Sequence, residues 1–249
     1  MLIPALVMRA EDVADKLAEA GVTEFTAAYE AWDGARFGAA AEFFRQATTN
    51  APTSSTFFYW LGAAQFHRLL QLQTLPSSRT NQLAAEAVMD AALAALSSAV
   101  KLDEQHAESH ALLGTLYGMK IDDNTLRALR FGPRLAKHQK QALEFGPENP
   151  RVRYLLGTCQ FHTAKKPAAQ REALTTLLAA ETLYVKEASR AARPLEPRWG
   201  HSSCLTFIGR TYELLGQRTE AADYFRKALA EHPADHLARQ GLARVTEKK

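Results

Sequence analysis

The chain has 249 residues, of which 47% are hydrophobic and 23% charged, a composition typical of soluble globular proteins with a sizeable core. Its 30 basic and 27 acidic residues leave a net charge of +3, so weak an excess that nucleic-acid binding is not expected. Two cysteines, neither in a CxxC pair, exclude a disulfide framework, and no uninterrupted apolar run reaches the ~18 residues of a membrane span.

The N-terminal residues 2–8 are apolar, but no basic region precedes them and acidic side chains follow closely. A secretory signal peptide begins with a basic region, so this pattern favours a docking helix over residues 1–20. The compartment stays open on this evidence. The cytoplasm is slightly favoured, and the periplasm is the alternative if the start is truncated or a signal has been removed.

From residue 21 onward, the chain divides into units that each contain two helical segments. A small residue recurs within the first helix of each unit, at Ala28, Gly62, Gly114, Gly157 and Gly209. The predicted units are 21–54, 55–105, 107–149, 150–198 and 202–235, followed by a capping helix and tail at 236–249.

The last unit carries the fullest pattern of small and aromatic residues, which ends in a proline. Its marked positions are Ile208, Gly209, Tyr212, Gly216, Ala221, Phe225, Ala228 and Pro233. Gly209 and Ala221 are small enough for two helices to approach closely, and Gly216 permits a tight turn between them. Tyr212 and Phe225 fill the space between the helices, and Pro233 ends the second helix.

This spacing resembles the tetratricopeptide repeat, a helical hairpin of ~34 residues. Weaker copies of the motif stand upstream, at Ala40-x3-Phe44, Leu61-Gly62, Leu113-Gly114-x2-Tyr117 and Leu156-Gly157. The resemblance implies an all-α fold, a right-handed solenoid of antiparallel helical hairpins with about five repeats and a C-terminal capping helix.

The whole chain also resembles a group of largely uncharacterised bacterial tetratricopeptide proteins, through residues 109–121, 146–158 and 197–200. Many members of that group look exported, and the resemblance implies no known reaction. A glycine-rich loop often precedes the second helix of the fourth repeat in that group, and residues 164–167 (AKKP) stand there in this chain.

The repeat length departs from the family after the first unit. The extra residues fall at 71–88, at 119–134 and in a lengthened helix at 167–192. Around the first of these we expect a turn at 76–78 and a long alanine-rich helix at 79–102. Extra residues in a solenoid either build a binding face or form tolerated surface loops, and both readings stay open here.

The resemblance also implies where a partner would bind, because the first helix of each tetratricopeptide hairpin lines the concave surface. The groove residues that follow are Tyr59, Phe66, His67, Glu108, Thr115, Arg151, Tyr154, Thr158, Phe161, His162, Arg210 and Glu213. Arg151 and Arg210 are the expected anchors, since Arg and aromatic side chains are favoured at binding hot spots. In the alternative reading, Phe66 and Phe161 replace missing core tyrosines, and Tyr59 and Tyr154 also belong to the core.

Residues for catalysis or metal binding are not evident. The histidine pairs His106/His110 and His232/His236 lack an HExxH motif or an acidic cluster, and no GxSxG or GxxxxGK motif occurs. Cys159 is expected in the core and Cys204 partly exposed. We therefore expect no enzyme activity, metal or cofactor.

A basic stretch at 127–140 contains Arg127, Arg130, Arg134, Lys137 and Lys140. It favours a solvated helix face, with a nucleic-acid-associated adaptor as one alternative function. A metal- or small-molecule-handling enzyme on the same scaffold is the other. The sequence predicts an interaction scaffold that binds a partner peptide or protein in its groove, and it indicates neither the identity of that partner nor the oligomeric state.

Overall fold

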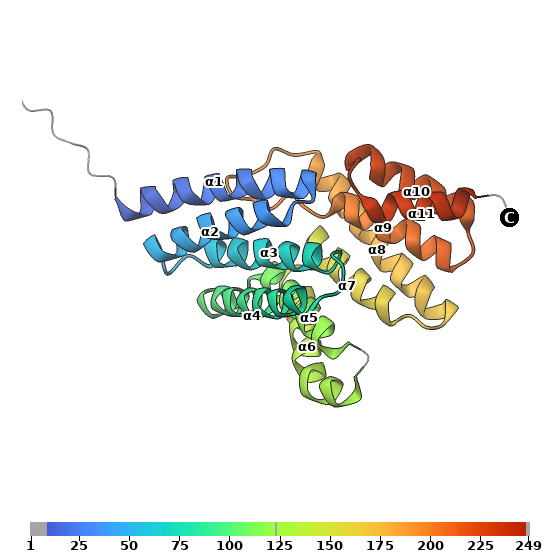
Figure 1. The fold of residues 1–249 in the computed structure, drawn as a ribbon, viewed down its shortest axis with the longest axis horizontal. Coiled ribbons are helices and arrows are strands. Elements are labelled where there is room, and N and C mark those ends of the chain that lie inside the picture. The colour runs from blue at the N-terminus through green and yellow to red at the C-terminus, as the bar shows by residue number, and fades with distance from the viewer. Residues whose placement is uncertain (1–8, 123, 248–249) are drawn as a thin grey trace, which may run out of the picture. The chain divides into compact units, whose positions relative to one another are not determined.

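The computed structural model describes residues 9–122 and 124–247, and this part of the chain consists of helices joined by turns and loops, the longest of them at 189–200 (Figure 1). It contains no strand, which confirms the all-α prediction. The helices are α1 (Ala10–Ala31), α2 (Gly34–Asn50), α3 (Ser55–Leu72), α4 (Arg79–Leu102), α5 (Ala107–Ile121), α6 (Thr125–Phe145), α7 (Pro150–Thr163), α8 (Pro167–Ala188), α9 (His201–Leu214), α10 (Arg218–Glu231) and α11 (His236–Thr246).

Consecutive helices pack as antiparallel hairpins, in which α3 pairs with α4, α5 with α6, α7 with α8, and α9 with α10. The first helices of successive hairpins also touch, since α5 contacts α7 and α7 contacts α9. The last helix, α11, covers α10 and part of α9, as a capping helix does.

The contacts divide the chain into two compact units. Among the described residues, the first contains α2, α3, α4 and the part of α1 up to Tyr29. The second contains residues 30–32 and the helices α5 through α11. Each unit buries apolar side chains of its own helices.

One continuous helix, α1, stands where the sequence suggested a docking helix at 1–20 followed by a separate repeat helix. It is 22 residues long, and its buried residues include Phe25 and Ala28. The Phe25 ring meets the Phe37 ring of α2 at a centroid distance of 5.5 Å. No proline interrupts residues 10–31, so the helix runs through the expected boundary. Residues 1–8 of the expected docking helix lie outside the described residues.

The extra residues of the middle repeats lengthen their second helices. α4 has 24 residues, α6 has 21 and α8 has 22, whereas α10 of the regular last repeat has 14. Side chains at the helix starts stabilise this arrangement, because Ser78 accepts a hydrogen bond from the Asn81 amide and Asn124 accepts one from the Arg127 amide.

The last hairpin shows why its motif residues are small. A Cβ atom at Gly209 would lie 2.8 Å from Cδ1 of Phe225, so α9 and α10 could not approach as closely with alanine there. Gly216 has a φ of 76°, a left-handed conformation that favours glycine at this turn. Both roles were predicted from the sequence.

In the part of the chain that the structure describes, α4 is the one helix with the length and apolar composition of a membrane span. The core helices of globular proteins can have the same length and composition. α4 packs along α3, and its Ala92, Leu96 and Ala99 are fully buried.

Candidate functional site

The groove candidates of the first unit, Tyr59, Phe66 and His67, are all buried side chains of α3. His67 lies edge-on to the Phe25 ring at 5.0 Å, and its Nδ1 donates a hydrogen bond to the Ala63 carbonyl at 2.8 Å. Burial lowers the pKa of His67 to about 4. His67 is therefore a neutral core residue at neutral pH, and its Tyr59 and Phe66 neighbours on α3 are also core side chains.

Arg151, one of the two expected anchors, is a buried side chain whose donors are bonded inside the second unit. Its Nε donates to Oε1 of Glu108 at 2.8 Å, and its Nη1 and Nη2 donate to the two carboxylate oxygens of Glu187 at 2.9 and 2.6 Å. Asn149 also donates to Glu108, at 2.8 Å. Arg151 is 2% exposed, and Glu108 and Glu187 are each below 10%. This network joins α5, α7 and α8 and leaves Arg151 no free edge for a partner.

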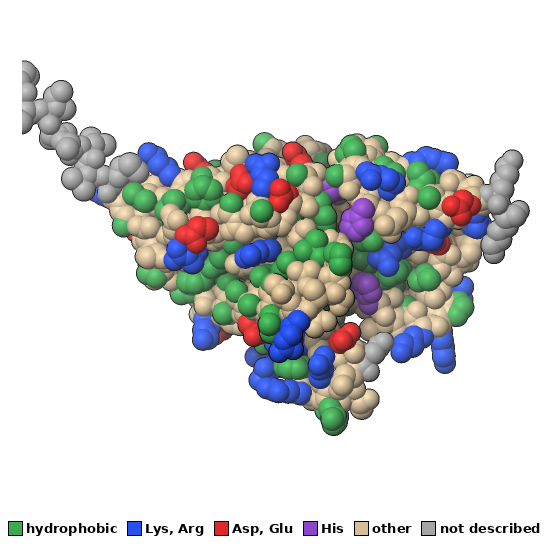
Figure 2. Space-filling model, viewed as in Figure 1, with side chains coloured by type: hydrophobic (Ala, Val, Ile, Leu, Met, Phe, Trp, Pro, Cys, Tyr) green, Lys and Arg blue, Asp and Glu red, His purple; other side chains and the backbone are tan. Residues whose placement is uncertain are grey.

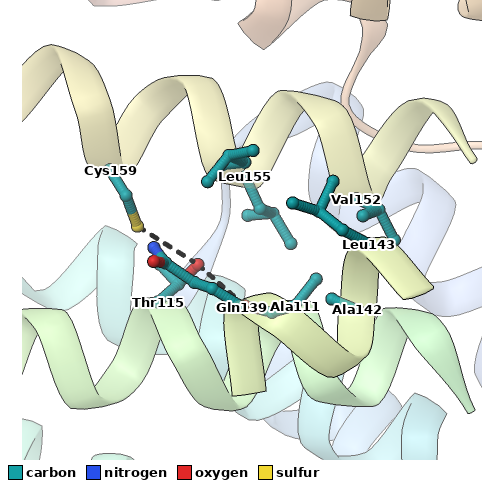
Figure 3. Close-up of a pocket in the computed structure, with 9 residues that line it drawn as sticks. Ala111, Thr115, Gln139, Ala142, Leu143, Val152, Leu155 and Cys159 are labelled. Atoms are coloured by element: carbon teal, nitrogen blue, oxygen red, sulfur yellow. Dashed lines mark hydrogen bonds between the residues drawn. The ribbon is translucent and has the colours of Figure 1, made fainter. Parts of the chain in front are cut away.

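The two threonine candidates, Thr158 and Thr115, lie where helices pack against one another. Thr158 is buried and donates to the Leu155 carbonyl at 2.9 Å. Thr115 accepts a hydrogen bond from Sγ of Cys159 at 3.9 Å, beside a small cavity between α5, α6 and α7 (Figure 3). The cavity measures about 10 Å³ and is lined by Ala111, Thr115, Gln139, Ala142, Leu143, Val152, Leu155, Leu156 and Cys159. It holds at most one water molecule and is too small for a ligand.

Cys204 was expected to be partly exposed, and this prediction was wrong. Its side chain is fully buried between α9 and α8, and its Sγ lies 3.5 Å from the Leu177 carbonyl oxygen. Burial, and next the charge of Glu181, raise its pKa well above the usual thiol value. The position before Leu205 faces α8, a contact that the repeat pattern alone did not show.

Four of the expected groove residues do meet, on the adjoining first helices α7 and α9. Tyr154, Phe161 and His162 come from α7 and Arg210 from α9, and Phe207 of α9 lies among them. The Phe161 and Phe207 rings pack edge to face at 5.3 Å. The Arg210 guanidinium stands over both, 4.8 Å from the Phe161 centroid and 4.9 Å from the Phe207 centroid. We call these five residues the Arg210 cluster.

Arg210 has no carboxylate partner within ion-pair distance among the described residues. The acidic side chain nearest to it in sequence, Glu213, binds Arg244 of α11 through two hydrogen bonds of 2.7 and 2.9 Å. Asp235 accepts from Thr206 at 2.6 Å and caps α11. Burial, and next the charge of Arg244, lower the pKa of Arg210, but a guanidinium stays charged at any physiological pH. The cluster therefore holds a half-buried cation whose N–H groups are not used by a carboxylate.

His162 forms the exposed rim of the cluster. Its ring lies 5.2 Å from the Phe161 ring and 5.7 Å from the Phe207 ring. Burial, and next the charge of Arg210, lower its pKa below the usual histidine value. His162 is therefore neutral at neutral pH and offers one donor and one acceptor beside the guanidinium.

Phe207 was not among the predicted residues, although it completes the stack under Arg210. A signal for it was present, because Phe207 precedes Arg210 by three residues and so lies on the same face of a helix. The repeat positions assigned to the groove did not include it.

A larger cavity lies in the first unit, between α2, α3 and α4, and none of the predicted groove residues line it. It measures about 240 Å³ and is lined by Gly38, Ala41, Glu42, Arg45, Leu61, Gln65, Arg68 and Ala91. The Oε1 atom of Gln65 is buried there without a hydrogen-bond donor.

The two histidines of the pair His106/His110 have separate contacts. His106 accepts a hydrogen bond from the Ser109 amide at the start of α5, whereas His110 lies 2.8 Å from His138 of α6, measured between their Nδ1 atoms. Within the described ranges, three or more His, Cys, Asp or Glu side chains do not gather in a group that could hold a metal ion.

The sequence profile of the family described as regulator of microtubule dynamics protein 1-3 matches residues 25–247, nearly the whole chain. The chain belongs to this family. None of the curated proteins matches it.

The fold of this member of the regulator of microtubule dynamics family is similar to that of solved tetratricopeptide structures. A thermophilic tetratricopeptide protein of Thermus thermophilus is 17% identical, with a TM-score of 0.65, over 93% of this chain and 98% of that one. A chain of the APC/C hetero-tetramer Cut9-Hcn1 is 16% identical, with a TM-score of 0.58, over 95% of this chain and 38% of that one. At such identities the likeness concerns the fold, and it confirms the predicted tetratricopeptide-type helical solenoid.

Proposed function

We propose that this member of the regulator of microtubule dynamics family is an interaction scaffold that binds a partner protein segment at the Arg210 cluster. The segment places a carboxylate on the Arg210 guanidinium and an apolar side chain against Phe207, the partly exposed ring that packs on the buried Phe161. The observation that carries this proposal is a cation held over two aromatic rings, with its N–H groups free of any carboxylate in the described chain.

The geometry suits carboxylate recognition because the rings fix the guanidinium plane before a ligand arrives. A planar guanidinium binds a carboxylate through two parallel hydrogen bonds, and charge-assisted hydrogen bonds contribute ~1.5–3 kcal/mol each. The half-buried position of Arg210 removes water that would otherwise screen the pair. His162 can donate or accept one further hydrogen bond at the rim.

A binding role is better supported than an enzymatic one. Cys204 is buried and Cys159 is partly buried, and the loss of hydration raises the pKa of both thiols, so neither is a thiolate nucleophile at neutral pH. Stacked helical hairpins also form extended surfaces suited to protein segments. The family description names microtubule dynamics as the process that its members regulate, and we place the proposed partner among the proteins of that process.

Peptide selection tests the proposal and does not require the partner to be identified first. A random peptide library displayed on phage is selected on the whole chain, and the enriched peptides are expected to carry Asp, Glu or a free C-terminal carboxylate beside an apolar residue. Arg210→Met retains the aliphatic stem and removes the charge, so it should weaken the selected peptides roughly tenfold or more.

Arg239→Met is the matched control, because Arg239 is an exposed arginine of α11. It should leave the affinity of the selected peptides unchanged. Selected peptides that lack acidic groups, or that bind the Arg210→Met variant as tightly as the original chain, would contradict the assignment of the cluster.

A further inference from the structure

The helix α6 carries a concentration of positive charge that the proposed function does not use. Between residues 125 and 143 it contains five basic residues and no acidic residue, in a chain whose charges nearly cancel overall. The excess of positive charge is confined to this helix. The net charge of the whole chain, +3, does not reveal it.

One side of α6 is occupied by packing against α5. Phe131 stacks on the Tyr117 ring at 6.1 Å, and the His138 ring stacks on the same tyrosine at 5.7 Å. A Cβ atom at Gly118 would lie 3.2 Å from Cδ1 of Leu135. The inward face of α6 is thus fixed by Phe131, Leu135 and His138.

The exposed surface of α6 presents leucines and cations together. Leu126 is 78% exposed and Leu129 is 73% exposed, the two largest values among the exposed large hydrophobic side chains of the described residues. Arg130, Arg134 and Lys137 are also exposed and lie within three helical turns of these leucines. Figure 2 shows hydrophobic and Lys or Arg side chains next to one another over this end of the α5–α6 hairpin.

Two of these cations are held by aromatic rings rather than by carboxylates. The Arg130 guanidinium lies 5.2 Å from the Phe131 centroid, and that of Arg134 lies 5.7 Å from the Tyr117 centroid. Arg127 is different, because it lies 3.9 Å from Asp122 at the hairpin turn, where both side chains are exposed. Among the described residues, the charge without a carboxylate partner therefore belongs to Arg130, Arg134, Lys137 and Lys140, of which the first three lie nearest to the two leucines in sequence.

We propose that these five residues, Leu126, Leu129, Arg130, Arg134 and Lys137, dock this end of the hairpin on a membrane surface that carries anionic lipids. The two leucines enter the boundary between headgroups and acyl chains, and the three cations contact the lipid phosphates. Helices with basic and apolar side chains on an exposed face bind in this way, with a strength that depends on both contributions.

A membrane accounts for this surface better than a nucleic acid or a protein does. Single-stranded nucleic acid needs open aromatic rings on which bases stack, whereas Phe131 and Tyr117 are stacked on each other. A protein interface needs a desolvated pocket for its central side chains, whereas Leu126 and Leu129 protrude at a hairpin end. Two protruding leucines beside cations supply both contributions on which interfacial binding depends.

Co-sedimentation with lipid vesicles tests the proposal on the full chain. The chain should sediment with vesicles of phosphatidylcholine and phosphatidylserine and remain in solution with vesicles of phosphatidylcholine alone. Added salt should weaken the binding, because screening reduces the attraction between the cations and the lipid phosphates. Absence of binding to the anionic vesicles at low salt would overturn the proposal.

Two double variants separate the apolar and the electrostatic contributions. Leu126→Asp with Leu129→Asp, and Arg130→Glu with Arg134→Glu, should each lower the partition coefficient roughly tenfold or more. All four side chains are exposed, so the circular dichroism spectrum should not change.

Matched controls come from exposed residues on other helices. Val185→Asp, at a side chain 59% exposed on α8, and Arg79→Glu with Arg171→Glu should retain vesicle binding. Equal loss in the controls and the test variants would show a non-specific charge effect and overturn the proposal. Binding to RNA or polyglutamate that resists the leucine changes, without vesicle binding, would instead assign the face to those ligands.

Discussion

Arg151 and Arg210 stand on the first helices of consecutive hairpins, and the sequence suggested the same anchoring role for both. The structure gives Arg151 two carboxylates, Glu108 and Glu187, from helices on either side, and buries all three groups. Arg210 instead lies over the two aromatic rings of Phe161 and Phe207, and the neighbouring Glu213 forms an ion pair with Arg244. The difference shows that the partners supplied by other helices decide whether an arginine stabilises the fold or remains available to a ligand.

The largest expected effect is on stability, and it contrasts the two arginines directly. Arg151→Met should lower the free energy of unfolding by ~3–5 kcal/mol, because it leaves two buried carboxylates without a counter-charge. Arg210→Met should cost about 1 kcal/mol or less, the contribution of a cation–π contact. Urea denaturation followed by circular dichroism measures both. Equal losses of stability in the two variants would remove the distinction between a structural and a ligand-binding arginine.

The next effect concerns pH and extends the comparison to the histidines His67 and His162. His67 has a pKa of about 4 in the folded chain, below the usual 6.5 of an exposed histidine. Above pH 6.5 both states are neutral at this site, so the stability contribution is constant. As the pH falls from 6.5 to 4, the unfolded chain binds a proton that the folded chain does not, and folding loses about 3 kcal/mol.

His67→Phe should remove that loss, since phenylalanine suits the same aromatic surroundings and does not titrate. His236→Gln is the control, because His236 is less buried than His67. The free energy of unfolding at pH 7 and pH 4.5 gives the comparison. If His67→Phe and the original chain lost equal stability on acidification, the neutral core assignment of His67 would be wrong.

The smallest expected effect is on the peptide affinity of Arg210. Arg244→Met releases Glu213, which is three residues from Arg210 on α9 and can then compete for its guanidinium. An ion pair at this spacing contributes only ~0.2–0.5 kcal/mol, so the affinity for acidic peptides should fall about twofold. Isothermal titration of a selected peptide measures the change, with Arg239→Met as the reference. A higher affinity in Arg244→Met would show that Arg244 repels the peptide's cations instead of restraining Glu213.

The hairpin architecture could be predicted closely because its signals are local. Gly209 and Gly216 predicted a close helix contact and a turn, and the structure shows both. The long helix expected at 79–102 agrees with α4, whereas the turn expected at 76–78 lies earlier, at 73–74, and α8 ends at Ala188 instead of the expected 192. Helix ends are less predictable because terminal turns depend on capping contacts that vary with the loop conformation.

The candidate site could be predicted only in part. Phe161, His162 and Arg210 were expected to line a groove; the structure brings them together with Tyr154, and their role in binding a partner stays a prediction. The repeat register could not distinguish a core aromatic from an exposed one, because a solenoid helix contacts neighbours on several sides. Tyr59 is buried for that reason, although its repeat position is that of a groove residue.

The sequence by itself determined an all-helical chain of hairpins, because helix propensity, small residues at close contacts and glycine or proline at helix ends all act within a few residues. Only the tertiary structure decided which charged groups are satisfied. Glu187 and Glu108 lie 36 and 43 residues from Arg151 along the chain, and packing of α5, α7 and α8 brings them within hydrogen-bond distance. Ion pairing depends on distances of a few ångströms, and those distances are set by how the helices pack.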